Sequence, residues 1–272
     1  MTDAEFIHVT THGPIAWLHI DRPQKLNALS VELMRELSQA LDLVEQDDSV
    51  RVVILRGGEQ AFSVGYDIAQ EVEMGISTAE QWHAGLENNI ALTMKVWGLS
   101  KPVIGAVSGW CLAGGCELAM ACDMIVCTDD SKFGEPEIRF GSGPVTLLMP
   151  FLIGEKATNE LLFTGDTIDA HRARELGLVN HVVVRADLET STEDLATKIA
   201  LTPLPILRYT KRALTRAYTA MGLQTAVDGN HALAALLNSV STPERDTFTE
   251  LVATEGLKTA LAWRDRRYAT VN

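Results

Sequence analysis

The sequence predicts an α/β fold, and three observations support this. Short, wholly apolar runs at residues 52–55, 103–107 and 124–127 are typical of strands buried on both faces. Longer stretches with helical periodicity separate these runs, which favours parallel β-α-β connections. After about Gly154 the signals are mainly helical. We therefore expect a core at residues 1–199 and a helical C-terminal region at 200–272 that packs on the core or on another subunit.

The N-terminal half supports this element by element. Alternation at 15–20 predicts a strand, and Ser30 is a suitable N-cap for a helix at 31–46. One face of that helix carries apolar side chains, namely Leu33, Leu37, Leu41 and Val44. A turn through Gly65 and a helix around 78–99 come next.

Composition limits the classes of function. The chain has 272 residues, 46% of them hydrophobic, and a formal net charge of −13, which disfavours nucleic-acid binding but allows a small anionic ligand. The four cysteines lie in one apolar stretch without a C-x-x-C pair, so we expect buried free thiols and no metal. Neither a signal peptide nor a membrane-spanning run is evident, and a cytoplasmic location is the simplest expectation.

One acid stands out in the segment GWCLAGGCELAMACD, residues 109–123. Small residues let the backbone approach a ligand, and a helix beginning near Gly114 directs free N–H groups at the same space. Glu117 lies in the first turn of this helix. Position alone favours a simple interaction with the helix dipole, and the alternative is a catalytic carboxylate.

A second acidic segment favours the catalytic alternative. Glu135 and Glu137 flank Pro136 in a loop that follows the strand at 124–127. Loops after neighbouring parallel strands gather at one sheet edge, so Glu117 and Glu137 are expected to face one pocket. Two carboxylates around one substrate suit paired proton transfer. For Glu135 a solvated turn charge is the better expectation.

Backbone donors complete the candidate site. The N–H groups of Tyr66 and Gly114 are candidates for a two-donor hole that stabilises an oxyanion. His19 and His83 are more plausible as structural histidines. Pocket-lining roles for Tyr66 and for Trp82, Trp110 and Met149 compete with a simple place in the core.

Five motifs follow one another along the chain: RPQKLNAL at 22–29, AFSVGYDI at 61–68, the segment 101–123, FGEPEIRFG at 133–141 and GDTIDAHRARELGLVNHVV at 165–183. In this order they resemble the crotonase family, which includes enoyl-CoA hydratases and isomerases. The resemblance implies a spiral of stacked ββα turns, a homotrimer or homohexamer, and an acyl-CoA thioester substrate. Coenzyme A is then part of the substrate, and no separate cofactor is required.

The resemblance also implies roles for individual residues. Glu117 and Glu137 match the two catalytic glutamates of the hydratases, and the N–H groups of Tyr66 and Gly114 match the oxyanion hole. The positions that match the CoA site are Lys25, Asn27, Ala28, Val64, Gly65, Asp67 and Ile68. Together they imply addition of water across the 2,3 double bond of an enoyl-CoA, or the reverse dehydration.

Two departures from the family pattern leave other reactions open. Val145 stands where a glycine usually helps to place the water, and Tyr66 stands where alanine is common. The alternatives are isomerisation, hydratase-lyase cleavage, C–C hydrolysis or dehalogenation, on an aromatic, cyclic or branched acyl-CoA. A non-catalytic RNA-binding relative is disfavoured by the charge of −13, the two intact acids and the expected absence of a Lys/Arg-rich helix.

Overall fold

The computed structural model describes residues 4–269. The strands are β1 (Ile7–His12), β2 (Ile15–Ile20), β3 (Val52–Arg56), β4 (Ala61–Ser63), β5 (Val103–Val107), β6 (Trp110–Leu112), β7 (Met124–Thr128), β8 (Lys132–Gly134), β9 (Ile168–Asp169) and β10 (His181–Val183). The α-helices are α1 (Val31–Gln46), α2 (Ile68–Glu73), α3 (Ala79–Gly98), α4 (Gly114–Met120), α5 (Met149–Ile153), α6 (Glu155–Thr164), α7 (Ala170–Glu175), α8 (Leu188–Ala200), α9 (Leu204–Ala220), α10 (Leu223–Ser239), α11 (Pro243–Glu255) and α12 (Leu257–Tyr268). Short 3-10 helices are η1 (Pro23–Lys25), η2 (Pro136–Phe140) and η3 (Arg185–Asp187).

The strands form two sheets that the chain visits in turn. The larger sheet has the order β1-β2-β3-β5-β7-β10, and the smaller has the order β4-β6-β8-β9. β3, β5 and β7 of the larger sheet are each followed by a strand of the smaller sheet and then by a helix. These repeated ββα turns are the stacked spiral that the sequence resemblance implied. The predicted parallel connections are confirmed for β2, β3, β5 and β7.

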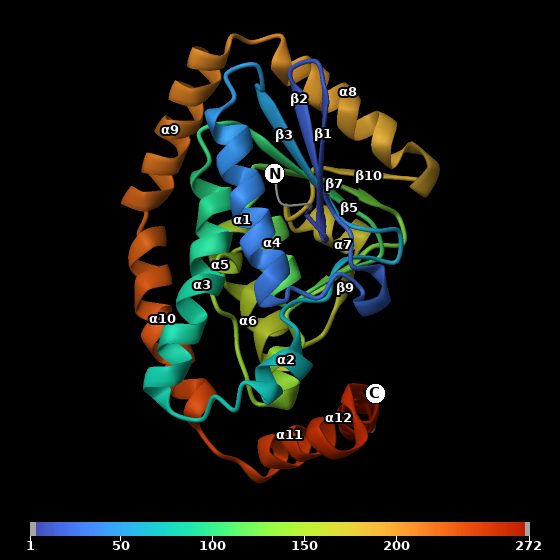
Figure 1. The fold of residues 1–272 in the computed structure, drawn as a ribbon, viewed down its shortest axis with the longest axis vertical. Coiled ribbons are helices and arrows are strands. Elements are labelled where there is room, and N and C mark those ends of the chain that lie inside the picture. Colours follow the sequence, from blue (N-terminus) through green and yellow to red (C-terminus); the bar gives the residue numbers. More distant parts are fainter. Residues whose placement is uncertain (1–3, 270–272) are drawn as a thin grey trace.

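The apolar runs form strands because both of their faces are buried. Val53 and Leu55 of β3 pack in a core with α1, α3 and α4, whereas Val52 and Ile54 pack in a second core with α8. A period of two along the strand sends successive side chains to opposite faces. The larger sheet therefore lies between helical layers, with α8 on one side and α1 and α3 on the other (Figure 1).

The predicted α1 shows how local sequence fixes an element. Ser30 caps it by accepting a hydrogen bond from the Leu33 N–H, and Leu33, Leu37, Leu41 and Val44 are all buried. At the start of α3, Thr78 and Gln81 form a reciprocal capping box. Both helices border the cleft described below, so their caps help to define its walls.

Four helices lie in the described part of the C-terminal region, residues 200–269. α9 and α10 run beside α1 and α3, and α11 and α12 lie across one end of the molecule near α2 (Figure 1). Phe248, Val252 and Ala260 of the last two helices pack with Ile68 and Val72 of α2. The C-terminal segment thus covers part of its own core.

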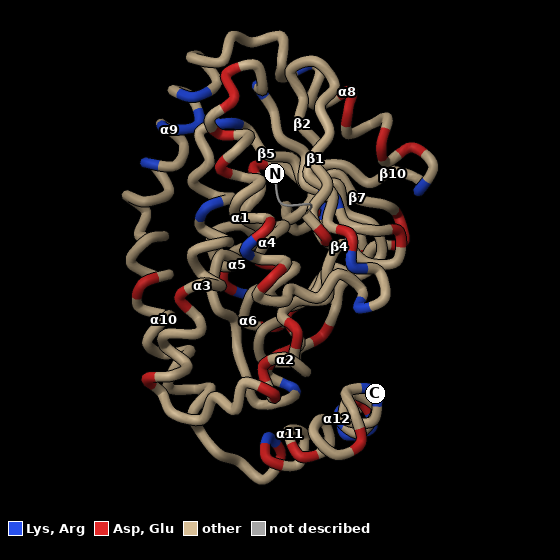
Figure 2. The backbone as a smooth tube through the Cα atoms, viewed as in Figure 1, with Lys and Arg blue, Asp and Glu red and all other residues tan. Residues whose placement is uncertain are grey.

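The expected absence of a Lys/Arg-rich helix is wrong. α9 carries Arg208, Lys211, Arg212 and Arg216, and Figure 2 shows blue segments but no red ones along this helix. Two of these cations have partners inside the chain: Lys211 is 5% exposed and pairs with Asp123 at 2.7 Å, and Arg208 pairs with Asp48 at 2.9 Å. These two charges therefore serve the fold of the chain.

Candidate active site

Two tight turns after parallel strands form the centre of the candidate site. Gly65 has φ +95° in the turn after β4, and Ala113 has φ +53° and ψ −135° in the turn before α4. A Cβ atom on Gly65 would lie 2.6 Å from the Ala113 Cβ and 3.1 Å from the Gly114 nitrogen. Glycine at position 65 therefore permits both the backbone angle and the close approach of the two turns.

The backbone pairing next to these turns leaves two N–H groups available. Leu29 N–H donates to Gly65 C=O at 2.8 Å and Asp67 N–H donates to Leu29 C=O at 3.2 Å, which bypasses the N–H of Tyr66. Gly114 is the first residue of α4, where helix N–H groups have no partner within the helix. Within residues 4–269, neither the Tyr66 nor the Gly114 N–H donates a hydrogen bond.

Glu117 projects from α4 into the protein interior. Its side chain is fully buried, and its Oε1 accepts hydrogen bonds from Val145 N–H at 2.6 Å and Thr146 N–H at 2.7 Å. The Tyr66 hydroxyl lies 3.5 Å from Oε2. Burial raises the pKa of Glu117, and the two backbone donors act in the opposite direction. These contacts go beyond the simple helix-dipole interaction.

Val145 stands where the family pattern has glycine, and its backbone N–H still forms a hydrogen bond. Its φ is not positive, so a β-branched residue fits the backbone without strain. Its N–H donates to the Glu117 carboxylate.

Glu137 lies on η2, which follows β8 of the smaller sheet. The side chain is 6% exposed, and within the described residues neither carboxyl oxygen has a hydrogen-bond partner. Burial raises its pKa to about 8, and the nearby charge of Glu117 adds to the effect. The two acids thus influence each other electrostatically but have different hydrogen-bonding environments.

The expectation that Glu135 is a solvated turn charge is wrong. Glu135 is 2% exposed, and its carboxyl oxygens also lack hydrogen-bond partners in the described part of the chain. Burial, followed by the charges of Glu117 and Glu137, raises its pKa well above the usual range. Turn residues around proline are commonly exposed, but here β8 and η2 lie inside the protein, so all three acids are interior groups.

The positions expected to contact CoA come together as two adjacent segments. Asn27 is 1% exposed and ties its loop to β4, because its Nδ2 donates to Ala61 C=O at 3.0 Å. Asp67 caps α2 and pairs with Arg22 at 2.7 Å. Lys25 is exposed on η1, and the remaining positions lie on the same two segments, namely Ala28, Val64, Gly65 and Ile68. The sequence pointed to the motif at residues 22–29 but did not predict a role for Arg22 itself.

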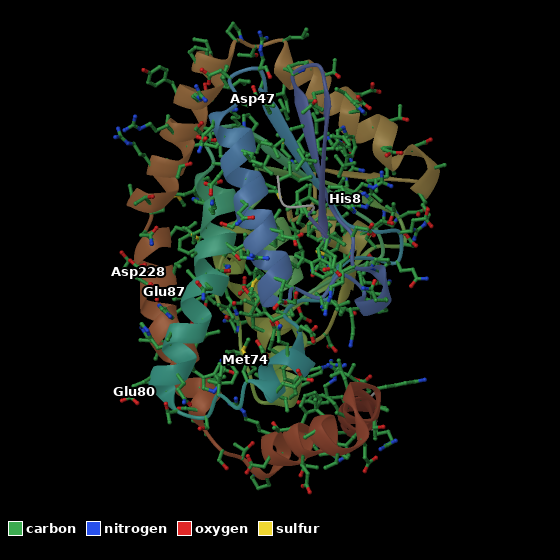
Figure 3. The ribbon with its side chains drawn as sticks, viewed as in Figure 1. His8, Asp47, Met74, Glu80, Glu87 and Asp228 are labelled. Atoms are coloured by element: carbon green, nitrogen blue, oxygen red, sulfur yellow. The ribbon has the colours of Figure 1, made fainter. Side chains whose placement is uncertain are left out.

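A cleft of about 740 Å³ opens between α1, α2 and α3, and Tyr66, Asp67 and Trp82 line it. Figure 3 labels Met74 where α2 approaches α3, and this residue also lines the cleft. Met149 is instead buried in the main core, and Trp110 is 43% exposed. Of the four apolar candidates, Tyr66 and Trp82 line this cleft.

The two histidines and the four cysteines considered in the sequence have structural surroundings. His83 stacks on His231 with ring centroids 3.8 Å apart, and burial lowers the pKa of His19. All four cysteines are buried free thiols, and residues 4–269 contain no cluster of three side chains that could hold a metal ion. No helix in the described chain has the length and apolar character needed to cross a bilayer.

Comparisons with known proteins agree with the geometry. The profile of the enoyl-CoA hydratase/isomerase family matches residues 10–250. The short-chain-enoyl-CoA hydratase of Clostridium acetobutylicum is 34% identical over 253 residues, covering 92% of this chain and 90% of that protein. The crotonyl-CoA hydratase of Syntrophomonas wolfei is 34% identical over 218 residues, covering 79% and 81%.

The fold is also shared with a solved structure. The crystal structure of an enoyl-CoA hydratase/isomerase from Xanthobacter autotrophicus Py2 superposes with a TM-score of 0.93 at 37% identity, covering 96% of this chain and 97% of that one. Sequence profile, relatives and fold agree over nearly the whole length. The chain therefore belongs to the enoyl-CoA hydratase/isomerase family, known as the crotonase family.

Proposed function

We propose that this enzyme is an enoyl-CoA hydratase, a hydro-lyase that adds water across the 2,3 double bond of an acyl-CoA thioester or runs the reverse dehydration. The observation that carries the proposal is the pair of buried carboxylates, Glu117 and Glu137, beside two unused backbone N–H groups. This combination supplies a base, an acid and an oxyanion hole in one interior site.

The different surroundings of the two acids support different roles for them. Glu117 accepts two N–H bonds, which favour its carboxylate, so it acts as the base. Glu137 accepts none, and its pKa of about 8 keeps it protonated at neutral pH, so it acts as the acid. Coenzyme A would lie along Lys25, Ala28, Val64, Gly65, Asp67 and Ile68.

The proposed step balances in protons and electrons. Glu117 takes a proton from water while the water oxygen bonds to C3. The π electrons of the C2=C3 bond move toward the thioester, whose oxygen receives the N–H groups of Tyr66 and Gly114. The Glu137 carboxyl group gives its proton to C2, and the enzyme is reset when the proton on Glu117 is returned to Glu137.

One contact favours a second candidate reaction. The Tyr66 hydroxyl faces Glu117 Oε2, the oxygen that the two backbone donors leave free. If this hydroxyl occupies the place of the water, proton transfer by Glu137 alone would suit a crotonase-family isomerase, a hydratase-lyase or a C–C hydrolase on an aromatic, cyclic or branched acyl-CoA.

The test is loss of the conjugated enoyl-thioester absorbance when the protein is mixed with crotonyl-CoA. Glu117→Gln and Glu137→Gln should each lower kcat by about 10²- to 10⁴-fold, because each removes a general acid or base. Glu87→Gln is the matched control, because Glu87 is exposed on α3 and does not line the cleft.

The same variants separate the two candidate reactions. Hydration should require both acids, whereas conversion of a 3-enoyl-CoA to its 2-enoyl isomer should survive Glu117→Gln. A wild-type protein that leaves crotonyl-CoA and a panel of longer, aromatic and branched 2-enoyl-CoAs unchanged would overturn the hydratase proposal.

We also propose that the protein assembles as a homotrimer or homohexamer through its C-terminal region, residues 200–272. Large apolar side chains on α9 and α10 are exposed in the single chain, including Ile206, Tyr209, Leu214, Leu233 and Leu236. Apolar patches of this kind mark association surfaces.

A further inference from the structure

A second cleft adjoins the first. It measures about 580 Å³ and lies where α2 and η2 face α11, with Phe140 and Phe248 among its lining residues. Glu71, Ile76 and Trp82 line both clefts. The two spaces therefore meet at one wall, and the C-terminal helix α11 closes the far side of the second.

Two charged groups stand at this junction. The Glu71 side chain is partly exposed to both clefts, and it accepts no hydrogen bond from the described residues. The Arg245 guanidinium lies 5.5 Å from the centre of the Trp82 ring, and its Nη1 donates to Leu237 C=O at 3.2 Å. Its Nε and Nη2 groups donate no hydrogen bond to the described part of the protein.

These groups act on one another without a direct bond. Burial raises the pKa of Glu71 to about 7, the charge of Asp67 adds to this, and Arg245 opposes it. Glu71 and Arg245 are both partly exposed, so a ligand that enters the second cleft displaces solvent from them and must supply hydrogen bonds in its place. Glu71 and Arg245 are therefore complementary to a polar group that both accepts and donates.

The junction also lies close to the proposed reaction centre. The charge of Glu71 raises the pKa of both Tyr66 and Glu137, so it is within electrostatic range of both groups. Tyr66 lines the same cleft as Glu71. An acyl chain whose thioester is held at Tyr66 and Gly114 can thus extend along this cleft toward Glu71.

We infer, building on the proposed acyl-CoA chemistry, that the acyl group bound here carries a hydroxyl at the end remote from the thioester, and that Glu71 and Arg245 bind this hydroxyl. Glu71 accepts the hydroxyl proton and Arg245 donates to its oxygen. A terminal methyl group offers no hydrogen bond to Glu71 or to the Nε and Nη2 groups of Arg245. A terminal carboxylate is opposed by the acidic side chain of Glu71.

Equilibrium binding tests the inference independently of turnover. Saturated acyl-CoAs of six, eight and ten carbons, each with a methyl, hydroxyl or carboxylate terminus, are titrated calorimetrically. At the chain length that reaches Glu71, the hydroxyl form should bind about 10-fold more tightly than the methyl form, as expected for one or two well-placed hydrogen bonds.

Variants assign this preference to the junction. Glu71→Leu and Arg245→Met should each abolish it, whereas Glu71→Gln, which still accepts the hydroxyl proton, should retain most of it. Glu73→Leu is the matched control, because Glu73 is exposed on the same helix and lines neither cleft. Thermal unfolding of each variant establishes that it is folded.

The outcomes separate this inference from the hydratase proposal. Equal binding of methyl and hydroxyl forms at every length, or tighter binding of the carboxylate form, would overturn the inference even if crotonyl-CoA is hydrated. A hydroxyl preference that depends on Glu71, in a protein that leaves every 2-enoyl-CoA unchanged, would support the inference and overturn the hydratase proposal.

Discussion

Glu117 and Glu137 are both buried, yet their environments differ in hydrogen bonding. Two backbone N–H groups stabilise the Glu117 carboxylate, whereas within the described chain Glu137 has no donor. Pairs of acids whose surroundings drive their pKa values apart commonly divide the tasks of acid and base. The different surroundings support the proposed assignment and make it testable through pH.

For hydration we expect kcat/KM to fall as pH rises through about 8, because Glu137 must be protonated to serve as the acid and its pKa is about 8. Dehydration requires ionised Glu137, so kcat/KM for dehydration should instead rise over the same pH range. The check is a pH profile in both directions. A hydration rate that stays flat between pH 6 and 10, with intact protein and constant rate-limiting chemistry, would refute the assignment.

Glu135 makes a prediction about stability. Its pKa is raised in the folded protein, so the folded state binds more protons than the unfolded state and stability falls as pH rises above the ordinary glutamate value of 4.5. Glu135→Gln removes this cost. We expect its Tm to exceed that of the wild type by roughly 3 °C at pH 8 and by much less at pH 5.

Thermal unfolding at the two pH values measures this difference. The matched control is Glu80→Gln, since Glu80 is exposed at the start of α3 and points to solvent (Figure 3). A Glu135→Gln protein that is equally destabilised at both pH values would show that the carboxyl group has a partner in solution.

At the scale of elements, the site depends on close contact between the turn after β4 and the first residue of α4. A Cβ on Gly114 would lie 2.5 Å from Cε2 of the Tyr66 ring, and one on Gly115 would lie 2.4 Å from Ser63 C=O. Backbone atoms cannot yield as a flexible side chain can. The backbone of Ser63 thus requires glycine at position 115, and the Tyr66 ring disfavours a larger residue at position 114.

We therefore expect Gly114→Ala to lower Tm by several degrees, because its methyl group meets the Tyr66 ring. In a Tyr66→Ala background most of this loss should disappear, because the opposing ring is gone. A double-mutant cycle of Tm values measures the coupling. Additive effects of the two substitutions would mean that the ring and Gly114 are not in contact.

At the scale of the whole molecule, the single chain leaves apolar surface uncovered along α9 and α10. Tyr209 is 72% exposed and Leu233 is 64% exposed, values far from those of the sheet core. We expect sedimentation to give three or six times the 29.7 kDa mass of one chain. Tyr209→Asp with Leu233→Asp should reduce this mass, because charges oppose burial at an interface.

The matched control carries two charges on other elements, as Val9→Asp on β1 with Leu43→Asp on α1, and both of these side chains are exposed. The control should keep the mass of the wild type. A wild-type protein that sediments as a single chain would overturn the proposed assembly.

The sequence by itself determined the fold class and the order of the elements. Local patterns predict the strands β3, β5 and β7, which are short apolar runs, and the capped, amphipathic helix α1. These patterns can be read from neighbouring residues alone. The motifs also singled out Glu117, Glu137, Tyr66 and Gly114, because glycine turns and acids beside proline are visible in a linear sequence.

Only the tertiary structure decided which charges are buried and what surrounds them. Glu135 became an interior group because β8 and η2 lie inside the protein, a long-range effect absent from its neighbours in sequence. Likewise, Glu71 and Arg245 come from α2 and α11, far apart in the chain, and line the same cleft only because α11 folds back over α2. Burial and long-range contacts set these environments, and local sequence patterns carry neither.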